Sequence, residues 1–348
     1  MRTWLLIYMV TALISCQTES SEQTVVSATE RIDGLNLVAS PEVPKPESFT
    51  TIRETGTEWV AIIPYAFSRP GQSQVIYNTE RQWAGERREG VIQTIRMAHE
   101  AGLKVMMKPH IWVLGQGWMG DFKLENKEDW QKWEKAYTDY LLYYTVLSDS
   151  LDVDMICIGT EMRQVVNTRP GFFPALIDSI KTVYDGRLTY AANWDNYRNV
   201  TFWQHLDYIG VDAYFPLSDD PLPSLANLQE AWRPLADELG RYAHEEDRPV
   251  LFTEYGYEST TYPAAGHWKE HKRTWNEEAQ SIALESLYAT FWQQKPWFAG
   301  GFLWKWHPTQ ATMQSGEDRE KYTVQNKAGL KTLKKWYAGT ENKEGTKK

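Results

Sequence analysis

Two glutamates lie at the ends of short apolar runs, far from each other in the chain. Glu161 belongs to MICIGTEM, which begins at Met155, and Glu254 belongs to VLFTEYGY, which begins at Val250. One carboxylic acid can protonate a leaving oxygen while a second carboxylate attacks carbon or activates water, which is how a glycosidic bond is hydrolysed. Either glutamate alone is equally well explained as a loop ion pair. The pair predicts this chemistry only if the fold brings both carboxyl groups to one place.

The elements that must position them are eight short apolar runs separated by longer amphipathic stretches. This alternation is typical of βα units around a parallel sheet. The runs begin at Gly34, Trp59, Lys104, Met155, Arg187, Tyr208, Val250 and Phe298. Glu161 therefore ends the fourth predicted strand and Glu254 ends the seventh.

The stretches between the runs have helical periodicity. In residues 88–101 the apolar side chains fall on one face, and Gly102 provides a stop signal. Similar patterns predict helices over residues 128–147, 172–184, 228–243, 277–293 and 327–337.

Together the strands and helices predict an α/β fold, a (β/α)8 barrel that forms a single catalytic domain over residues 31–340. An open doubly wound sheet is the alternative. It usually has fewer strands and a glycine-rich phosphate loop after the first, and GLNLVASPEV from Gly34 has no such loop.

The ends of the predicted strands carry the polar and aromatic residues. The strands begin apolar and end in segments such as KPHIW, GTEM, AANW, DAY, TEYGY and LWKW. In a barrel these ends open onto one face, where active sites lie. Glu161 and Glu254 are therefore expected to face each other across the barrel mouth.

The composition restricts the class of partner. The 348 residues include 17 Trp and 19 Tyr, enough to fill a barrel core and also to line a cleft where aromatic faces stack on sugar rings. The net charge is −9 and the chain has no stripe of Lys and Arg. A nucleic-acid partner is therefore not expected, because binding phosphates requires positive charge. A neutral polymer fits better.

The two glutamates and the motifs GTEM, KPHIW, GVDAYFP and TEYGY resemble glycoside hydrolase family 113 of clan A, over about residues 31–338. The resemblance implies an endo-acting β-mannanase that cleaves β-1,4-mannosidic bonds in mannan or glucomannan by double displacement. Glu161 is then the acid/base and Glu254 the nucleophile, with no organic cofactor and no metal. Thr160 precedes the acid/base, where the wider clan usually has Asn, so Asn193 or His110 is a candidate contact for the substrate 2-hydroxyl.

The resemblance also gives roles to other residues at the strand ends. Tyr214 is expected to donate a hydrogen bond to Glu254 and keep it ionised, and Trp304 to be the platform for the sugar at the cleavage point. Candidate sugar-hydroxyl contacts are His110, Lys108, Asn193, Trp194 and Asp212. Candidate outer platforms, for which surface packing is an equal alternative, are Trp112, Trp118 and Trp268.

Other functions stay open at this point. A clan A β-1,4-glucanase is one, because mannose and glucose differ in the orientation of a single hydroxyl and one hydrogen bond can decide between them. A metal-dependent hydrolase would need histidine pairs at ligand spacing, and the seven histidines are scattered. His267 and His271 are four apart, but a solvated loop cluster explains them better. A lipoprotein that only binds glycans would need neither glutamate.

The N-terminus resembles a bacterial lipoprotein signal. Arg2 precedes an apolar stretch over residues 4–14, which ends in Leu-Ile-Ser-Cys at Cys16. The resemblance implies that residues 1–16 carry the signal and the lipidated Cys16, that residues 17–30 are a flexible tether, and that residues 341–348 are a polar tail.

This reading places the protein outside the cytoplasm, anchored to a bacterial membrane at the cell surface or the periplasmic face, with the lipid as its only membrane contact. An ordinary secretory signal with a stray Cys is the alternative. The other cysteine, Cys157, is expected to be a buried, inert thiol.

Overall fold

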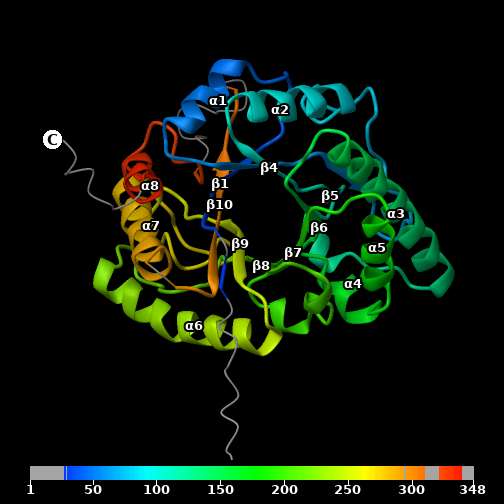
Figure 1. Ribbon diagram of the computed structural model, residues 1–348. Helices are drawn as coiled ribbons and strands as arrows, with labels where there is room; N and C mark the ends of the chain where they lie inside the picture. Colours follow the sequence, from blue (N-terminus) through cyan, green and yellow to red (C-terminus); the bar gives the residue numbers. More distant parts are fainter. Residues whose placement is uncertain (1–26, 29, 294, 310–320, 339–348) are drawn as a thin grey trace, which may run out of the picture.

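The computed structural model describes residues 27–28, 30–293, 295–309 and 321–338, and these contain the predicted barrel. Eight parallel strands close in the order β1-β10-β9-β8-β7-β6-β4-β2, and helices surround them (Figure 1). The (β/α)8 prediction is confirmed. The barrel strands are β1 (Ile32–Leu37), β2 (Trp59–Ile62), β4 (Lys104–Met107), β6 (Met155–Thr160), β7 (Arg187–Asn193), β8 (Tyr208–Asp212), β9 (Val250–Tyr255) and β10 (Phe298–Trp306).

The six predicted helices are present, with bounds that differ by up to a few residues. Asn126, Ser224 and Asn276 each cap a helix by accepting a hydrogen bond from a backbone N–H of its first turn. Two further helices, α1 and α4, are too short to show helical periodicity in the sequence. The helices are α1 (Pro46–Arg53), α2 (Arg88–Glu100), α3 (Lys127–Asp149), α4 (Arg163–Thr168), α5 (Phe172–Lys181), α6 (Leu225–Glu246), α7 (Glu277–Phe291) and α8 (Gly329–Tyr337).

Two of the predicted strands are each divided in two. After β2 and β4 the chain continues into β3 (Tyr65–Ser68) and β5 (His110–Val113), which pair with each other in a separate two-stranded parallel sheet. Each break contains a proline, Pro64 or Pro109, which has no backbone N–H to donate a hydrogen bond to the neighbouring strand. The breaks place Lys108 and His110 where the chain leaves the barrel wall.

The barrel has two layers of core. The interior holds a small cluster that includes Trp59, Met106, Cys157 and Phe302, while a larger cluster fills the space between strands and helices. Gly34 leaves room for Phe302, since a Cβ at Gly34 would lie 2.4 Å from the ring. Cys157 is fully buried as expected, and burial raises the pKa of its thiol to about 11. A neutral buried thiol is unreactive.

The opposite end of the barrel from the strand C-termini is closed by the segment that precedes β1. Glu30 accepts hydrogen bonds from Lys104 at 2.6 Å and Arg187 at 2.5 Å, and both cations lie over the Trp59 ring. The backbone N–H of Ala28 donates to Pro296. The last residues of the predicted tether therefore contact the barrel. Cys16, the earlier tether residues and the 341–348 tail lie outside the described residues.

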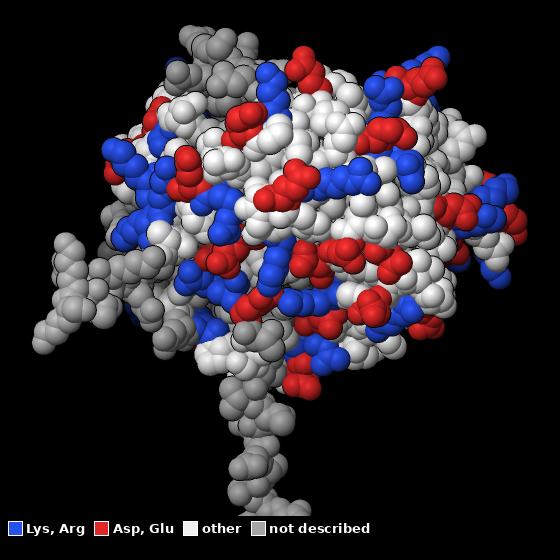
Figure 2. Space-filling view, turned by 45° about the horizontal axis from the view of Figure 1, so that its top comes forward, with Lys and Arg blue, Asp and Glu red and all other residues white. Residues whose placement is uncertain are grey.

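The surface carries mixed charge. On the face shown in Figure 2, Lys and Arg alternate with Asp and Glu and form no broad field of one sign. Among the helices that the structure describes, none is both long and apolar enough to cross a membrane.

Candidate active site

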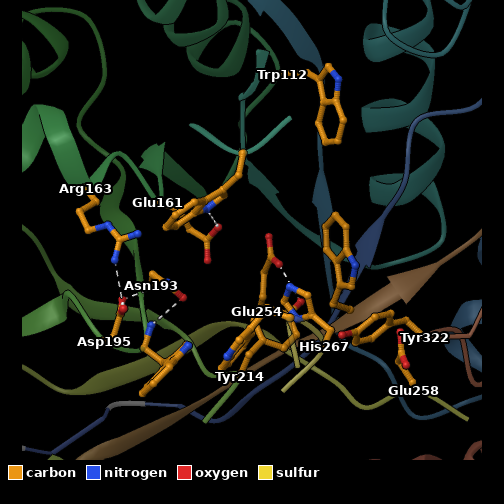
Figure 3. A pocket seen from close by; sticks show the side chains of 14 residues that line it. Trp112, Glu161, Arg163, Asn193, Asp195, Tyr214, Glu254, Glu258, His267 and Tyr322 are labelled. Carbon is orange, nitrogen blue, oxygen red and sulfur yellow. Dashed lines mark hydrogen bonds and ion pairs between the residues drawn. The ribbon is translucent and has the colours of Figure 1, made fainter. Parts of the chain in front are cut away.

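A cavity of about 730 Å³ opens at the C-terminal ends of the barrel strands, and it contains both predicted glutamates (Figure 3). Its lining comes from strand ends and from the segments that follow β5, β6, β7, β8, β9 and β10. The lining residues are Trp112, Trp118, Glu161, Arg163, Asn193, Trp194, Asp195, Tyr214, Glu254, Glu258, His267, Trp268, Trp304 and Tyr322.

Glu254, in β9, is held by donors on both carboxyl oxygens. Lys108 Nζ donates to Oε1 at 2.5 Å and the Tyr214 hydroxyl donates to Oε2 at 2.8 Å. The hydrogen bond expected from Tyr214 is therefore present. Glu254 is only 6% exposed, so these two donors, one of them a cation, supply most of the stabilisation of a negative charge there.

Lys108 and Asp212 do not contact the cleft, which contradicts the prediction that they bind sugar hydroxyls. Both side chains are 0% exposed and lie beneath Glu254, with Lys108 Nζ 3.7 Å from Asp212 Oδ1. Burial lowers the pKa of Lys108, but the attraction of Asp212 and Glu254 outweighs it and the net shift is upward. Lys108 therefore acts on the carboxylate and not on substrate.

Glu161 directly follows β6 and turns into the cleft. Its φ of +51° is in the left-handed region, and its N–H donates to the carbonyl of Ala191 in β7 at 2.7 Å. The next N–H, of Met162, donates to the Tyr190 hydroxyl at 2.8 Å. A non-glycine residue in this conformation costs about 1–3 kcal/mol and persists where its surroundings fix it. The turn directs the carboxyl group toward Glu254.

The environment of Glu161 favours its protonated form. Burial is the largest cause that raises the pKa of Glu161, the negative charge of Glu254 adds to it, and the hydrogen bond from Trp118 opposes it, with a result of about 7. Trp118 Nε1 donates to Oε2 at 2.5 Å. Trp118 is predicted from the sequence as an outer platform or a packing residue, and no sequence pattern indicates this contact.

His110 and Trp304 lie side by side at the mouth. Their rings are stacked, with centroids 6.2 Å apart and planes 6° from parallel, and the peptide bond after Trp304 is cis. Burial, followed by the charge of Lys108, holds the pKa of His110 well below its ordinary value. His110 lines a smaller adjoining cavity of about 150 Å³, and its Nε2 has no hydrogen-bond partner among the described residues. Both predicted residues therefore face open space beside the glutamates.

The other predicted contacts form the opposite wall. Asn193 donates from Nδ2 to Asp195 at 3.0 Å, and Trp194 is stacked on Trp268 with centroids 5.5 Å apart. Trp268 is 46% exposed, and Trp112 on the other wall is 48% exposed. All five tryptophans predicted at the site line the main cavity: Trp112, Trp118, Trp194, Trp268 and Trp304.

Several lining residues were not predicted. Arg163 and Asp195 directly follow the strand-end motifs GTEM and AANW and pair with each other at 3.2 Å, so their positions after β6 and β7 were a usable signal. Glu258, His267 and Tyr322 lie in long loops whose paths the sequence does not specify.

The histidine pair expected as a solvated cluster is separated in the fold. His267 lines the cleft and meets the Tyr214 ring edge-on, whereas His271 stacks on Tyr262. Across residues 27–338, leaving out the undescribed gaps, no three His, Cys, Asp or Glu side chains are grouped as metal ligands.

The arrangement suits acid–base chemistry on a bond placed between two carboxyl groups. Glu254 accepts hydrogen bonds from Lys108 and Tyr214, which stabilise a carboxylate, while the pKa of Glu161 is raised to about 7, which favours the protonated acid. Two carboxyl groups in such different environments are typical of the acid and the base of an active site.

Comparisons with known proteins identify the family and the fold. The model of Glycoside Hydrolase Family 113 matches residues 42–327. The fold is similar to a GH113 β-mannanase from Alicyclobacillus acidocaldarius in complex with ManMIm, at 22% identity and a TM-score of 0.76, over 89% of this chain and 97% of that one.

Two further solved structures share the fold. One is a GH113 β-1,4-mannanase, at 21% identity and a TM-score of 0.76, over 89% of this chain and 99% of that one. The other is a family 5 mannosidase from Rhizomucor miehei, at 11% identity and a TM-score of 0.64, over 89% of this chain and 93% of that one. The comparison with curated proteins finds no match.

Proposed function

This chain belongs to glycoside hydrolase family 113, and from that premise we propose that it is a retaining endo-β-1,4-mannanase acting on mannan or glucomannan. The observation that carries the proposal is the contrast between the two glutamates. Glu254 has a cation and a hydroxyl as donors, while burial and the neighbouring charge raise the pKa of Glu161 to about 7.

In the proposed first step, Glu254 attacks the anomeric carbon and Glu161 gives its proton to the leaving oxygen. Lys108 and Tyr214 keep the attacking carboxylate charged and aimed until the glycosyl ester forms. The ester has no negative charge, so the repulsion that favoured protonation of Glu161 is gone. Glu161 can then take a proton from a water molecule whose oxygen attacks the anomeric carbon. The ester bond breaks, Glu254 is released as a carboxylate, and Glu161 is again protonated.

The choice of a mannan substrate is supported by the family 113 mannanases that share the fold. Internal cleavage is supported by the spread of aromatic side chains along the cleft. Trp112 lies on one side of the glutamates in Figure 3, and Tyr214 and His267 lie on the other. Rings on both sides can hold a sugar chain that extends past the cleavage point in both directions.

The experiment is a panel of soluble β-linked polysaccharides with sizing of early products. Mannan and glucomannan should yield a ladder of manno-oligosaccharides, and cellulose derivatives should be cut much more slowly. Faster cleavage of a β-glucan would make the enzyme a glucanase, and release of monosaccharide alone would contradict internal cleavage. Proton NMR of the first anomer tests the mechanism, because net inversion is incompatible with a glycosyl ester on Glu254.

A further inference from the structure

Trp118 makes a contact that binding a sugar does not require. Its indole N–H donates to Glu161 Oε2 at 2.5 Å. The edge of the ring therefore contacts the proposed acid/base, whereas stacking on a sugar would use only the face of the ring. The carbonyl oxygen of a protonated carboxyl group is its better acceptor, so a donor at Oε2 favours placement of the proton on Oε1. The contact therefore makes Oε1 the oxygen of Glu161 that is free to exchange a proton.

The ring is held from two sides. The Arg163 guanidinium lies over it, with Cζ 4.5 Å from the ring centroid, and Arg163 itself pairs with Asp195 at 3.2 Å and Asp121 at 3.7 Å. The backbone of Gly120 packs closely against the ring, and no larger residue fits at this position unless the ring moves, because a Cβ there would lie 2.3 Å from Trp118 Cζ2. The segment that presents Glu161 thus also supplies the cation that covers the ring.

We propose that Trp118 is a positioning residue for Glu161, fixing its Oε2 so that Oε1 alone gives and takes the catalytic proton, with Arg163 and Gly120 holding the ring in place. This inference rests on the proposed role of Glu161 as acid/base. A tryptophan that only stacked on a sugar would need neither the N–H contact nor the close approach of Gly120.

The contact also has an electrostatic effect that a purely structural ring would lack. A donor to Oε2 stabilises the ionised form, so its loss raises the pKa of Glu161. The other groups that act on this carboxyl are Glu254 in β9, Lys108 after β4 and Asp195 after β7. Trp118→Phe replaces none of these three groups and keeps an aromatic ring under Arg163, the partner of Asp195.

The test compares Trp118→Phe with wild type in the pH dependence of kcat/KM on a soluble manno-oligosaccharide. Phe keeps the ring and removes the donor. The alkaline limb, near pH 7 in wild type, should move up by roughly one pH unit, with a loss of about tenfold in kcat/KM at the wild-type optimum. Gly120→Ala, which displaces the ring without deleting it, should move the limb the same way.

Trp112→Phe is the matched control, since Trp112 lines the same cleft without touching Glu161. It should raise KM and leave the limb in place. An unmoved limb in both Trp118→Phe and Gly120→Ala would overturn the inference while the proposed function stood. If wild type cleaves no mannan, the proposed function fails, and carbon-13 NMR titration of the Glu161 carboxyl, assigned by its loss in Glu161→Gln, still tests whether Trp118→Phe raises its pKa.

Discussion

Lys108 Nζ lies 2.5 Å from Glu254 Oε1, and the lysine is completely shielded from solvent. Removing one member of a buried charged pair leaves the other without compensation, which is the most costly way to break such a contact. The cation is therefore part of what makes Glu254 usable as a carboxylate.

Lys108→Met should lower kcat by roughly 10- to 100-fold with little change in KM, because a charged hydrogen bond is worth about 1.5–3 kcal/mol and Lys108 does not reach substrate. Steady-state kinetics on mannan checks this. Lys104→Met, at the other end of the barrel, is the control and should keep wild-type kcat. A large rise in KM for Lys108→Met would mean that the lysine binds sugar after all.

The two glutamates should respond differently to removal. Glu254→Gln should lower turnover on every substrate by about 10³-fold or more, since no ester can form. Glu161→Ala should lose about 10²- to 10⁴-fold on mannan but keep rapid first-step release from an aryl mannoside whose leaving group needs no proton. Burst kinetics distinguish the steps. Equal losses on both substrates in Glu161→Ala would remove the acid role from this residue.

Glu161→Gln should make the protein more stable at neutral pH. The pKa of Glu161 is raised in the fold from 4.5 to about 7, so ionisation favours the unfolded chain once the pH exceeds 4.5. The penalty grows up to about pH 7 and reaches at most about 3 kcal/mol, less what solvent in the cleft screens. Thermal unfolding should show a higher Tm than wild type at pH 8 and a similar Tm at pH 4. A gain that is independent of pH would point to some other cause.

Glu30→Gln should weaken the closure of the barrel in a pH-dependent way. Burial raises the pKa of Glu30, but its bonds from Lys104 and Arg187 lower it more, and the net shift is downward. The ion pairs therefore stabilise the fold above the ordinary pKa, and that contribution is lost as pH falls. The pairs are partly exposed, so the expected drop in Tm is only about 1–2 °C at pH 7 and smaller at pH 4. The reverse order would contradict the assignment.

We propose that the protein is anchored by lipid at Cys16 on a bacterial membrane, as the N-terminal motif implies. A single acyl chain binds membranes only marginally, so stable anchoring depends on the several chains that this modification attaches. Cys16→Ser should move the protein from the membrane pellet to the soluble fraction after export in a bacterial host. Cys157→Ser, which changes a buried thiol, should leave the distribution as in wild type. A wild-type protein that is already soluble would end the proposal.

The sequence determined the barrel and the two carboxyl groups, because both depend on short-range patterns. Apolar runs and helical periodicity mark strands and helices locally, and a closed parallel barrel brings every strand end to one face whatever the loops do. The sequence therefore suffices to assign one rim to Glu161, Glu254, Tyr214, Trp304, His110, Asn193 and Trp194.

Tertiary structure alone decided which strand-end residues face substrate and which face one another. The sequence places Lys108 and Asp212 at the rim with the other strand-end residues, yet both are fully buried, and Lys108 contacts Asp212 and Glu254 instead of the cleft. Trp118 and His267 belong to loops whose paths are set by contacts with distant segments, such as Arg163 for Trp118. Such contacts join residues that are far apart in the sequence, and no local hydrophobic or helical periodicity indicates them.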